Sequence, residues 1–177
     1  SSTQSFTITT APSASFTYAQ AAYCSNDANP TPSVTGTAGV FSSTTGLDVN
    51  GSTGTINLSN STAGAYTVTN TVNISGCPTA TETFDITVNA APSAVVTLSG
   101  TTLTAQETGA TYQWYDCATS SAVAGATNQT FSPTTPGSYK VTVTKGGCSA
   151  TSVCETVTNA GIAMNGMDTV SIYPNPT

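Results

Sequence analysis

The feature that most constrains the fold is a short pattern that occurs twice: a glycine turn that leads into a strand beginning with tyrosine. One copy spans residues 62–69 and the other spans residues 135–143. In the second copy Tyr139, Val141 and Val143 alternate with polar residues, which is typical of a strand with one buried face. A tyrosine at the head of such a strand, just after a glycine turn, predicts the tyrosine corner of an immunoglobulin-like sandwich.

Two corners predict two modules. Tyr139 follows Tyr66 by 73 residues, close to the size of a minimal immunoglobulin-like domain, and a chain of 177 residues has room for two. We therefore predict an all-β chain of two tandem antiparallel β-sandwiches, over residues 11–90 and 91–159. Trp114 is expected in the core of the second module.

Other short strands are expected between glycine and asparagine turns of the first module, at 15–18, 39–43, 46–50 and 54–58. In its corner strand the side chains expected to face the core are Tyr66, Val68, Val72 and Ile74, and Asn70 interrupts that pattern. A first hairpin of the second module is expected at 95–104.

The ends of the sequence are expected to lie outside the two modules. Residues 5–14 resemble 83–94, the last strand of the first module and its linker, so residues 1–10 are interpreted as the last strand of a preceding module. The alternative is that they form the first strand of the first module. Residues 160–169 are small and aperiodic and are interpreted as a linker, and 170–177 begin another strand.

Composition excludes several function classes. Charged residues make up 6% of the chain, with two lysines, no arginine, no histidine and a net charge of −6. Such a chain lacks the basic patch that binds nucleic acid or anionic membrane. It also lacks an apolar run of about 20 residues, the length that a membrane helix needs. We expect neither a nucleic-acid partner nor membrane insertion.

Candidate catalytic residues are few. Without histidine a Ser–His or Cys–His pair is impossible, so acid–base chemistry would depend mainly on carboxylates. Asp116 and Glu155 could approach one another if their strands share a sheet, although solvated positions at strand ends are the favoured interpretation. The run Asp48–Ser52 resembles a calcium loop faintly, but an Asn-Gly turn explains it better. We predict no enzyme, no metal site and no cofactor.

Exposed aromatic side chains could stack on sugars, and Tyr18, Tyr23 and Tyr115 are the candidates. Packing in a core or a hairpin is the favoured explanation for all three. A glycan-binding surface is the alternative.

Five cysteines in a chain this small indicate an oxidising, extracytoplasmic setting. Cys24 ends an early strand and Cys77 follows the first corner strand, so we predict a bridge between them. We also predict a bridge between Cys117, at the end of the tryptophan strand, and Cys154, opposite the start of the second corner strand. Cys148 would then be unpaired or held by another chain.

Three segments resemble known bacterial families. One set of residues, 112–117 with 125–131, 135–143 and Gly147-Cys148, resembles the immunoglobulin-like modules of Bacteroidetes surface proteins. A second set, 46–56 with 64–68, resembles the gliding-motility-associated repeats of the same proteins. The last segment, Ser171-Ile172-Tyr173-Pro174-Asn175-Pro176-Thr177, resembles the opening of the C-terminal sorting domain read by the type IX secretion system.

This resemblance implies a secreted or outer-surface protein that passes through the periplasm. Tyr173, Pro174, Asn175 and Pro176 would then belong to a sorting signal recognised by the type IX machinery, in a domain that the family continues for several tens of residues. Asp168-Thr169-Val170 resembles the O-glycosylation acceptor of the same bacteria, which implies a glycan on Thr169.

These observations predict a non-catalytic stalk or spacer. The alternatives are an adhesin module that binds a glycan or a protein, and the accessory domains of an enzyme that lies upstream.

Overall fold

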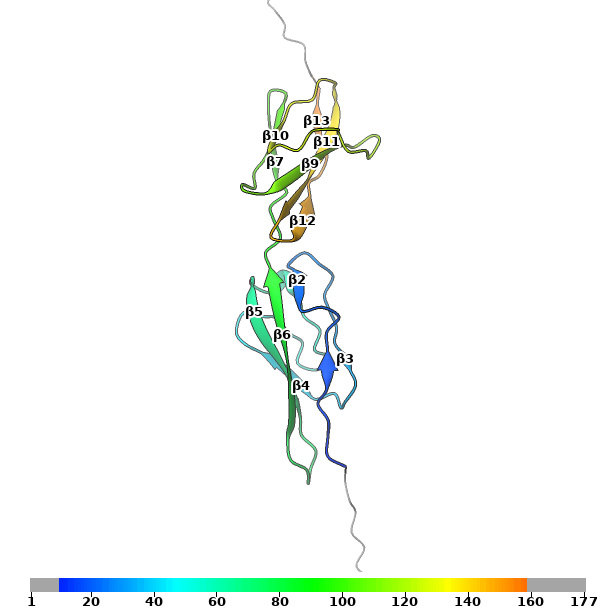
Figure 1. The fold of residues 1–177 in the computed structure, drawn as a ribbon, viewed down its shortest axis with the longest axis vertical. Helices are drawn as coiled ribbons and strands as arrows, with labels where there is room; N and C mark the ends of the chain where they lie inside the picture. The colour runs from blue at the N-terminus through cyan, green and yellow to red at the C-terminus, as the bar shows by residue number, and fades with distance from the viewer. Residues whose placement is uncertain (1–9, 159–177) are drawn as a thin grey trace, which may run out of the picture. The chain divides into compact units, whose positions relative to one another are not determined.

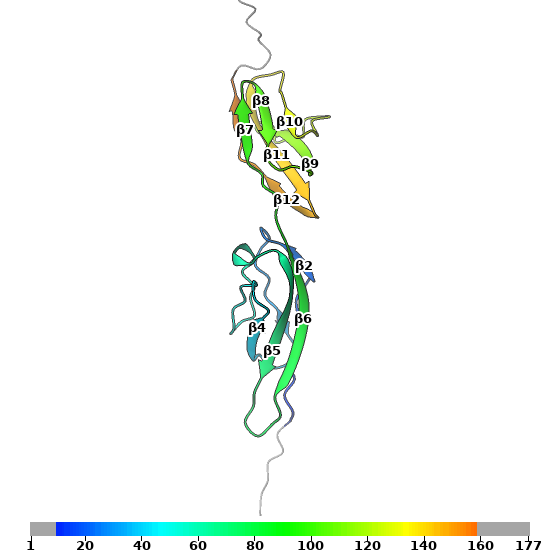
Figure 2. The same cartoon turned by 90° about the vertical axis from the view of Figure 1, so that its left-hand side faces the viewer.

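The computed structural model describes residues 10–158, and the features predicted for residues 1–9 and 159–177 lie outside the described residues. Contacts divide the chain into two compact units (Figures 1 and 2). Of the described residues, unit 1 holds 10–91 with 146–148, and unit 2 holds 92–145 with 149–158. Within the described residues the elements are β-strands and one 3-10 turn, η1 (Leu58–Asn60), so the predicted all-β class is confirmed.

Unit 1 is built on a sheet in the order β2-β6-β5-β4, and the short strands β1 and β3 pair separately. Its strands are β1 (Phe16–Thr17), β2 (Ala22–Cys24), β3 (Ser33–Val34), β4 (Val40–Ser43), β5 (Gly64–Val72) and β6 (Ala80–Asn89). The strand pairs are antiparallel except β2 with β6, which run parallel. The predicted antiparallel pairing therefore holds in unit 1 except at β2.

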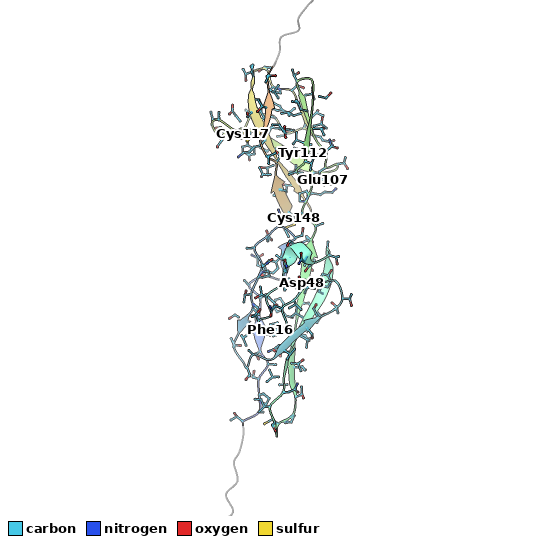
Figure 3. The ribbon with its side chains drawn as sticks, turned by 180° about the vertical axis from the view of Figure 1, so that it is seen from behind. Phe16, Asp48, Glu107, Tyr112, Cys117 and Cys148 are labelled. Carbon is cyan, nitrogen blue, oxygen red and sulfur yellow. A yellow bond between two sulfur atoms is a disulfide. The ribbon has the colours of Figure 1, made fainter. Side chains whose placement is uncertain are left out.

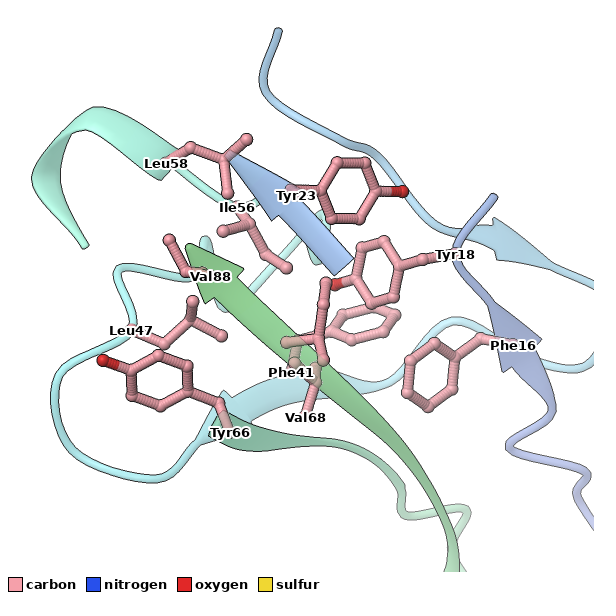
Figure 4. Packing of buried hydrophobic residues seen from close by; sticks show 11 residues of the cluster. Phe16, Tyr18, Tyr23, Phe41, Leu47, Ile56, Leu58, Tyr66, Val68 and Val88 are labelled. Carbon is pink, nitrogen blue, oxygen red and sulfur yellow. The ribbon is translucent and has the colours of Figure 1, made fainter. Parts of the chain in front are cut away.

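The core of unit 1 gathers aromatic and branched side chains from β1, β2, β4, β5 and β6 and from the loop before η1 (Figure 4). Phe16 meets Phe41 edge to face, with ring centroids 5.4 Å apart. The expected strands at 46–50 and 54–58 are absent, and only the bridge Val49↔Ile56 joins them. Their apolar side chains still reach the core, because Leu47, Ile56 and Leu58 are buried.

Asn70 is a buried polar residue on the inward face of β5. It faces inward, as Val68 and Val72 on β5 do, and is fully buried. Its Oδ1 accepts a hydrogen bond from the backbone N–H of Gly39 (3.0 Å), and its Nδ2 donates to the carbonyl oxygens of Ala14 (2.9 Å) and Thr37 (3.1 Å). Asn70 therefore satisfies three backbone groups of loops that have no strand partner there.

The inward pattern of β5 ends two residues earlier than the sequence predicted. Tyr66, Val68 and Val72 are buried, but Ile74 is exposed. The strand ends at Val72 and the chain turns toward β6, so Ile74 lies in the turn and has no sheet face to cover.

Unit 2 has a three-stranded sheet, β10-β8-β7, and a second sheet in which β11 pairs with β9, β12 and β13. Its strands are β7 (Val96–Ser99), β8 (Thr102–Ala105), β9 (Thr111–Asp116), β10 (Thr130–Phe131), β11 (Gly137–Lys145), β12 (Cys148–Thr151) and β13 (Glu155–Val157). The predicted first hairpin is confirmed as β7 and β8. Trp114 is fully buried, its indole N–H donates to Asn128 O (2.9 Å), and its ring stacks on Phe131 at 5.4 Å.

Both predicted tyrosine corners are confirmed, and they have the same geometry. The Tyr66 hydroxyl donates to Thr62 O (2.6 Å), and the Tyr139 hydroxyl donates to Thr135 O (2.9 Å), four residues upstream in each case. A Cβ added at Gly64 or Gly137 would come within 3.2 or 3.3 Å of its tyrosine hydroxyl. The spacing Thr-x-Gly-x-Tyr therefore suits the corner, because the ring folds back over the glycine and leaves little room for a side chain there.

We expect Tyr66→Phe and Tyr139→Phe each to lower the free energy of unfolding by about 1 kcal/mol, since each removes the partly buried hydrogen bonds of the hydroxyl with the carbonyl oxygen and the Oγ1 of its threonine. Hydrogen exchange measured by peptide assigns each loss to its unit. Tyr115→Phe is the control and should change stability by less than about 0.5 kcal/mol. Equal losses for all three variants would contradict a special role for the corners.

We expect Asn70→Ala to destabilise unit 1 by about 3 kcal/mol, because it leaves three buried backbone groups without partners. Urea denaturation followed by circular dichroism measures the change. The matched control is Asn73→Ala in the exposed turn after β5, for which we expect less than about 0.5 kcal/mol. A small effect at Asn70 would mean that water takes over its hydrogen bonds.

Candidate functional site

The carboxylate pair proposed from the sequence shares a sheet, but one strand separates its members. Asp116 and Glu155 both lie opposite Tyr139 in the strand register, on the two sides of β11. The Asp116 carboxylate accepts hydrogen bonds from the backbone N–H groups of Ala118 (2.7 Å) and Thr119 (3.2 Å). Asp116 therefore holds the turn that follows β9.

The weak calcium-loop candidate is also engaged in turn structure. Asn50 Oδ1 accepts hydrogen bonds from the backbone N–H groups of Ser52 and Thr53, both at 3.0 Å. Asp48 accepts one from the Asn60 side chain at 3.2 Å (Figure 3). Across residues 10–158 no three metal-ligating side chains gather around one point.

Two of the three aromatic candidates for sugar stacking are buried, which corrects that alternative. Tyr18 and Tyr23 belong to the core of unit 1, and Tyr115 is half-buried beside Lys140 in the register of β9 and β11. Burial raises the pKa of the Tyr18 hydroxyl, and the neighbouring Tyr23 raises it further. The neutral hydroxyl donates a hydrogen bond to Gly54 O, so Tyr18 fastens a loop.

The structure contains two disulfides, and together they indicate an oxidising, extracytoplasmic environment. One joins Cys117 to Cys154, the pairing expected from the sequence. Cys117 donates its backbone N–H to Ser138 O, and Cys154 directly precedes the residue paired with Tyr139. This bond therefore links the two neighbours of the corner strand at its start.

The other disulfide joins Cys24 to Cys148, so the predicted Cys24–Cys77 bridge is wrong, and Cys77 is a free thiol. The reason is the parallel pairing of β2, which places Cys24 opposite Asn89 at the end of β6. Cys77 lies in the turn before β6, and a strand of 10 residues is about 33 Å long. Disulfides need Cα atoms within about 7 Å, so these two cysteines cannot meet.

Cys148 was expected to be unpaired or held by another chain, and this expectation is corrected by the same bond. The turn 146–148 belongs by its contacts to unit 1, although the residues on either side belong to unit 2. Cys148 is 1% exposed. The covalent loop that the bond closes contains the boundary between Ala91 and Pro92.

The chain enters and leaves unit 1 at opposite ends of β6. Thr10, the first described residue, lies beside the turn before β6, with its carbonyl oxygen 3.9 Å from Cys77 Sγ. The exit lies past the far end of β6, where the Ala91 backbone N–H donates to Ser25 Oγ (3.0 Å). The length of the strand, about 33 Å, therefore separates entry from exit.

Unit 2 has the same arrangement along β11. At one end of β11, Lys145 donates to the Glu107 carboxylate, which also accepts the backbone N–H of Ser93 (3.0 Å) near the entry. At the other end, Gly137 pairs with Val157 near the exit. A strand of nine residues spans about 30 Å between them.

Glu107 is the charged residue that organises the entry of unit 2 (Figure 3). Hydrogen bonds from Lys145 and then from Ser93 hold the pKa of its carboxyl below the usual value. Its backbone carbonyl oxygen accepts from the Tyr112 hydroxyl (2.7 Å) and from Gln129 Nε2 (3.1 Å). No periodic pattern in the sequence points to Glu107, because its partners come from four separate segments.

Four predicted features lie outside the described residues: the sorting segment with Tyr173, Pro174, Asn175 and Pro176; the glycan on Thr169; the linker; and the strand at the start of the chain. Within the described residues no helix is long and apolar enough to cross a membrane.

Comparison with known proteins assigns this chain to no family. No family model matches it, and no curated protein does. Among solved structures, immunoglobulin domains 1–4 of Sidekick-1 match distantly, with 18% identity, a TM-score of 0.28, and coverage of 81% of this chain. The match covers 49% of the Sidekick-1 chain, so the present chain spans about half the length of that structure.

Proposed function

We propose that the two units are non-catalytic spacer modules of an exported bacterial surface protein. The observation that carries this proposal is the path of the chain through each unit. Entry and exit lie at opposite ends of a long strand, β6 in unit 1 and β11 in unit 2. Each unit therefore holds its own entry and exit apart by the length of its strand, about 30 Å.

The way the strands are held together supports the same proposal. On β11 and its neighbours, hydroxyl groups pair across strands: Thr142 with Thr151 (2.9 Å), Thr144 with Ser149 (2.8 Å) and Ser138 with Thr156 (2.9 Å). Neutral pairs are insensitive to ionic strength, whereas exposed ion pairs weaken as salt rises. A spacer outside the cell, where the salt concentration is not controlled, benefits from this.

We further propose that the protein leaves the cell by type IX secretion, with the segment containing Tyr173, Pro174, Asn175 and Pro176 as part of its sorting signal. The support is the resemblance of that segment, together with the extracytoplasmic setting that the two disulfides indicate. The partner on this route is the secretion machinery.

The spacer proposal predicts that deleting residues 10–158 from the protein brings an N-terminal tag closer to the cell surface. An epitope tag placed before Ser1 should become several-fold less accessible to antibody on intact cells of a Bacteroidetes host. Access in lysed cells is the control and should not change. Equal access on intact cells, with and without the two units, would contradict a spacer.

The export proposal predicts that replacing residues 173–176 by alanine leaves the parent protein in the periplasm. Cell fractionation and surface proteolysis measure the distribution. The matched control replaces four residues of the preceding segment, 164–167, by alanine and should reach the surface normally. Normal display of the first variant would overturn the sorting role.

A further inference from the structure

We propose that the Cys24–Cys148 disulfide is a covalent strap, a cross-link that carries tension along the chain and keeps the residues between the two cysteines from being pulled out. The bond joins residues 124 positions apart, and the second bond, Cys117–Cys154, joins residues 37 positions apart. The strap deepens the spacer proposal and rests on it for its biological purpose.

The order of the four cysteines decides which bond carries the tension. Along the chain they follow as Cys24, Cys117, Cys148 and Cys154, so the two covalent loops overlap. The shortest covalent route from Thr10 to Thr158 runs to Cys24, across the bond to Cys148, and on to the end. The route through Cys117 is longer, because it must first cover residues 24–117. The first bond alone therefore sets the maximum extension.

Most of both hydrophobic cores lies inside the loop that the strap closes. In unit 1 these are the core residues between 41 and 88, and in unit 2 those between 103 and 143. A pull on the two ends cannot draw these segments out while the bond is intact. In an oxidised spacer the load therefore bypasses these segments and acts directly only on the residues outside the loop, among them the core residues Phe16, Tyr18, Tyr23 and Val157.

The strap is attached at packed positions. Cys24 pairs with Asn89 at the end of β6, and the next residue, Ser25, donates its backbone N–H to Asn89 O (2.9 Å). Cys148 is almost completely buried, at 1% exposure. Tension that enters at Cys24 is therefore borne by a residue already paired to the sheet.

The test is single-molecule pulling of the oxidised full chain, 1–177, with handles at its two ends and Cys77→Ser in every version to prevent thiol exchange. In the variant Cys24→Ser/Cys148→Ser the first bond no longer withholds its 124 positions, and the second bond withholds 37. The variant should thus extend by 87 residues more (124 minus 37), about 300 Å at about 3.5 Å per residue.

The matched control is Cys117→Ser/Cys154→Ser, which also removes one disulfide. It should reach the same full extension as the parent, because the shortest route does not use that bond. Full extension depends on covalent connectivity alone, so it is informative even for a variant that folds poorly. In Cys24→Ser/Cys148→Ser, reducing the remaining Cys117–Cys154 bond should add a further 37 positions, about 130 Å, to the full extension.

The strap is overturned if the oxidised chain with both disulfides extends as far as Cys24→Ser/Cys148→Ser. It is also overturned if Cys117→Ser/Cys154→Ser lengthens by the same distance, about 300 Å. Either result leaves the spacer proposal standing, since antibody access on cells tests it separately. Conversely, unchanged antibody access would end the spacer proposal without altering the extension of the purified chain.

Discussion

The parallel pairing of β2 with the end of β6 is the constraint on which much of this structure depends. It brings Cys24 to the exit end of unit 1, opposite Asn89, and leaves Cys77 at the other end. The same pairing explains why the bond is made to Cys148. If β2 had paired near the start of β6, Cys77 would have been within reach, and the loop closed by the bond would have stayed within residues 24–77.

The tyrosine corners show how a short sequence pattern can determine a local structure. A threonine carbonyl oxygen accepts the hydroxyl, a glycine leaves room for the ring, and the tyrosine begins the strand. These contacts lie within five residues, so they form in the same way in both units despite different surroundings. For that reason the corners, the all-β class and the buried Trp114 could be predicted from the sequence.

Features that depend on distant segments could not be predicted in this way. The direction of β2 is set by its packing on β6, which alternation of apolar residues does not encode. Asn70 looked like an interruption of the strand, but three loop backbone groups converge on it. Glu107 likewise gathers contacts from separate segments. For Tyr18 and Tyr23 the favoured interpretation, packing in a core, is confirmed, and sugar stacking was the alternative.

The shortage of positive charge in this chain has a consequence for its resistance to proteases. Proteases of the trypsin type cut after lysine or arginine, and this sequence offers them two lysines. Lys140 lies inside β11, paired in register with Tyr115, and Lys145 is bound to Glu107 at the end of the same strand. Cleavage needs a segment that opens from the fold. Because both lysines lie in one well-paired strand, such enzymes have few places to cut.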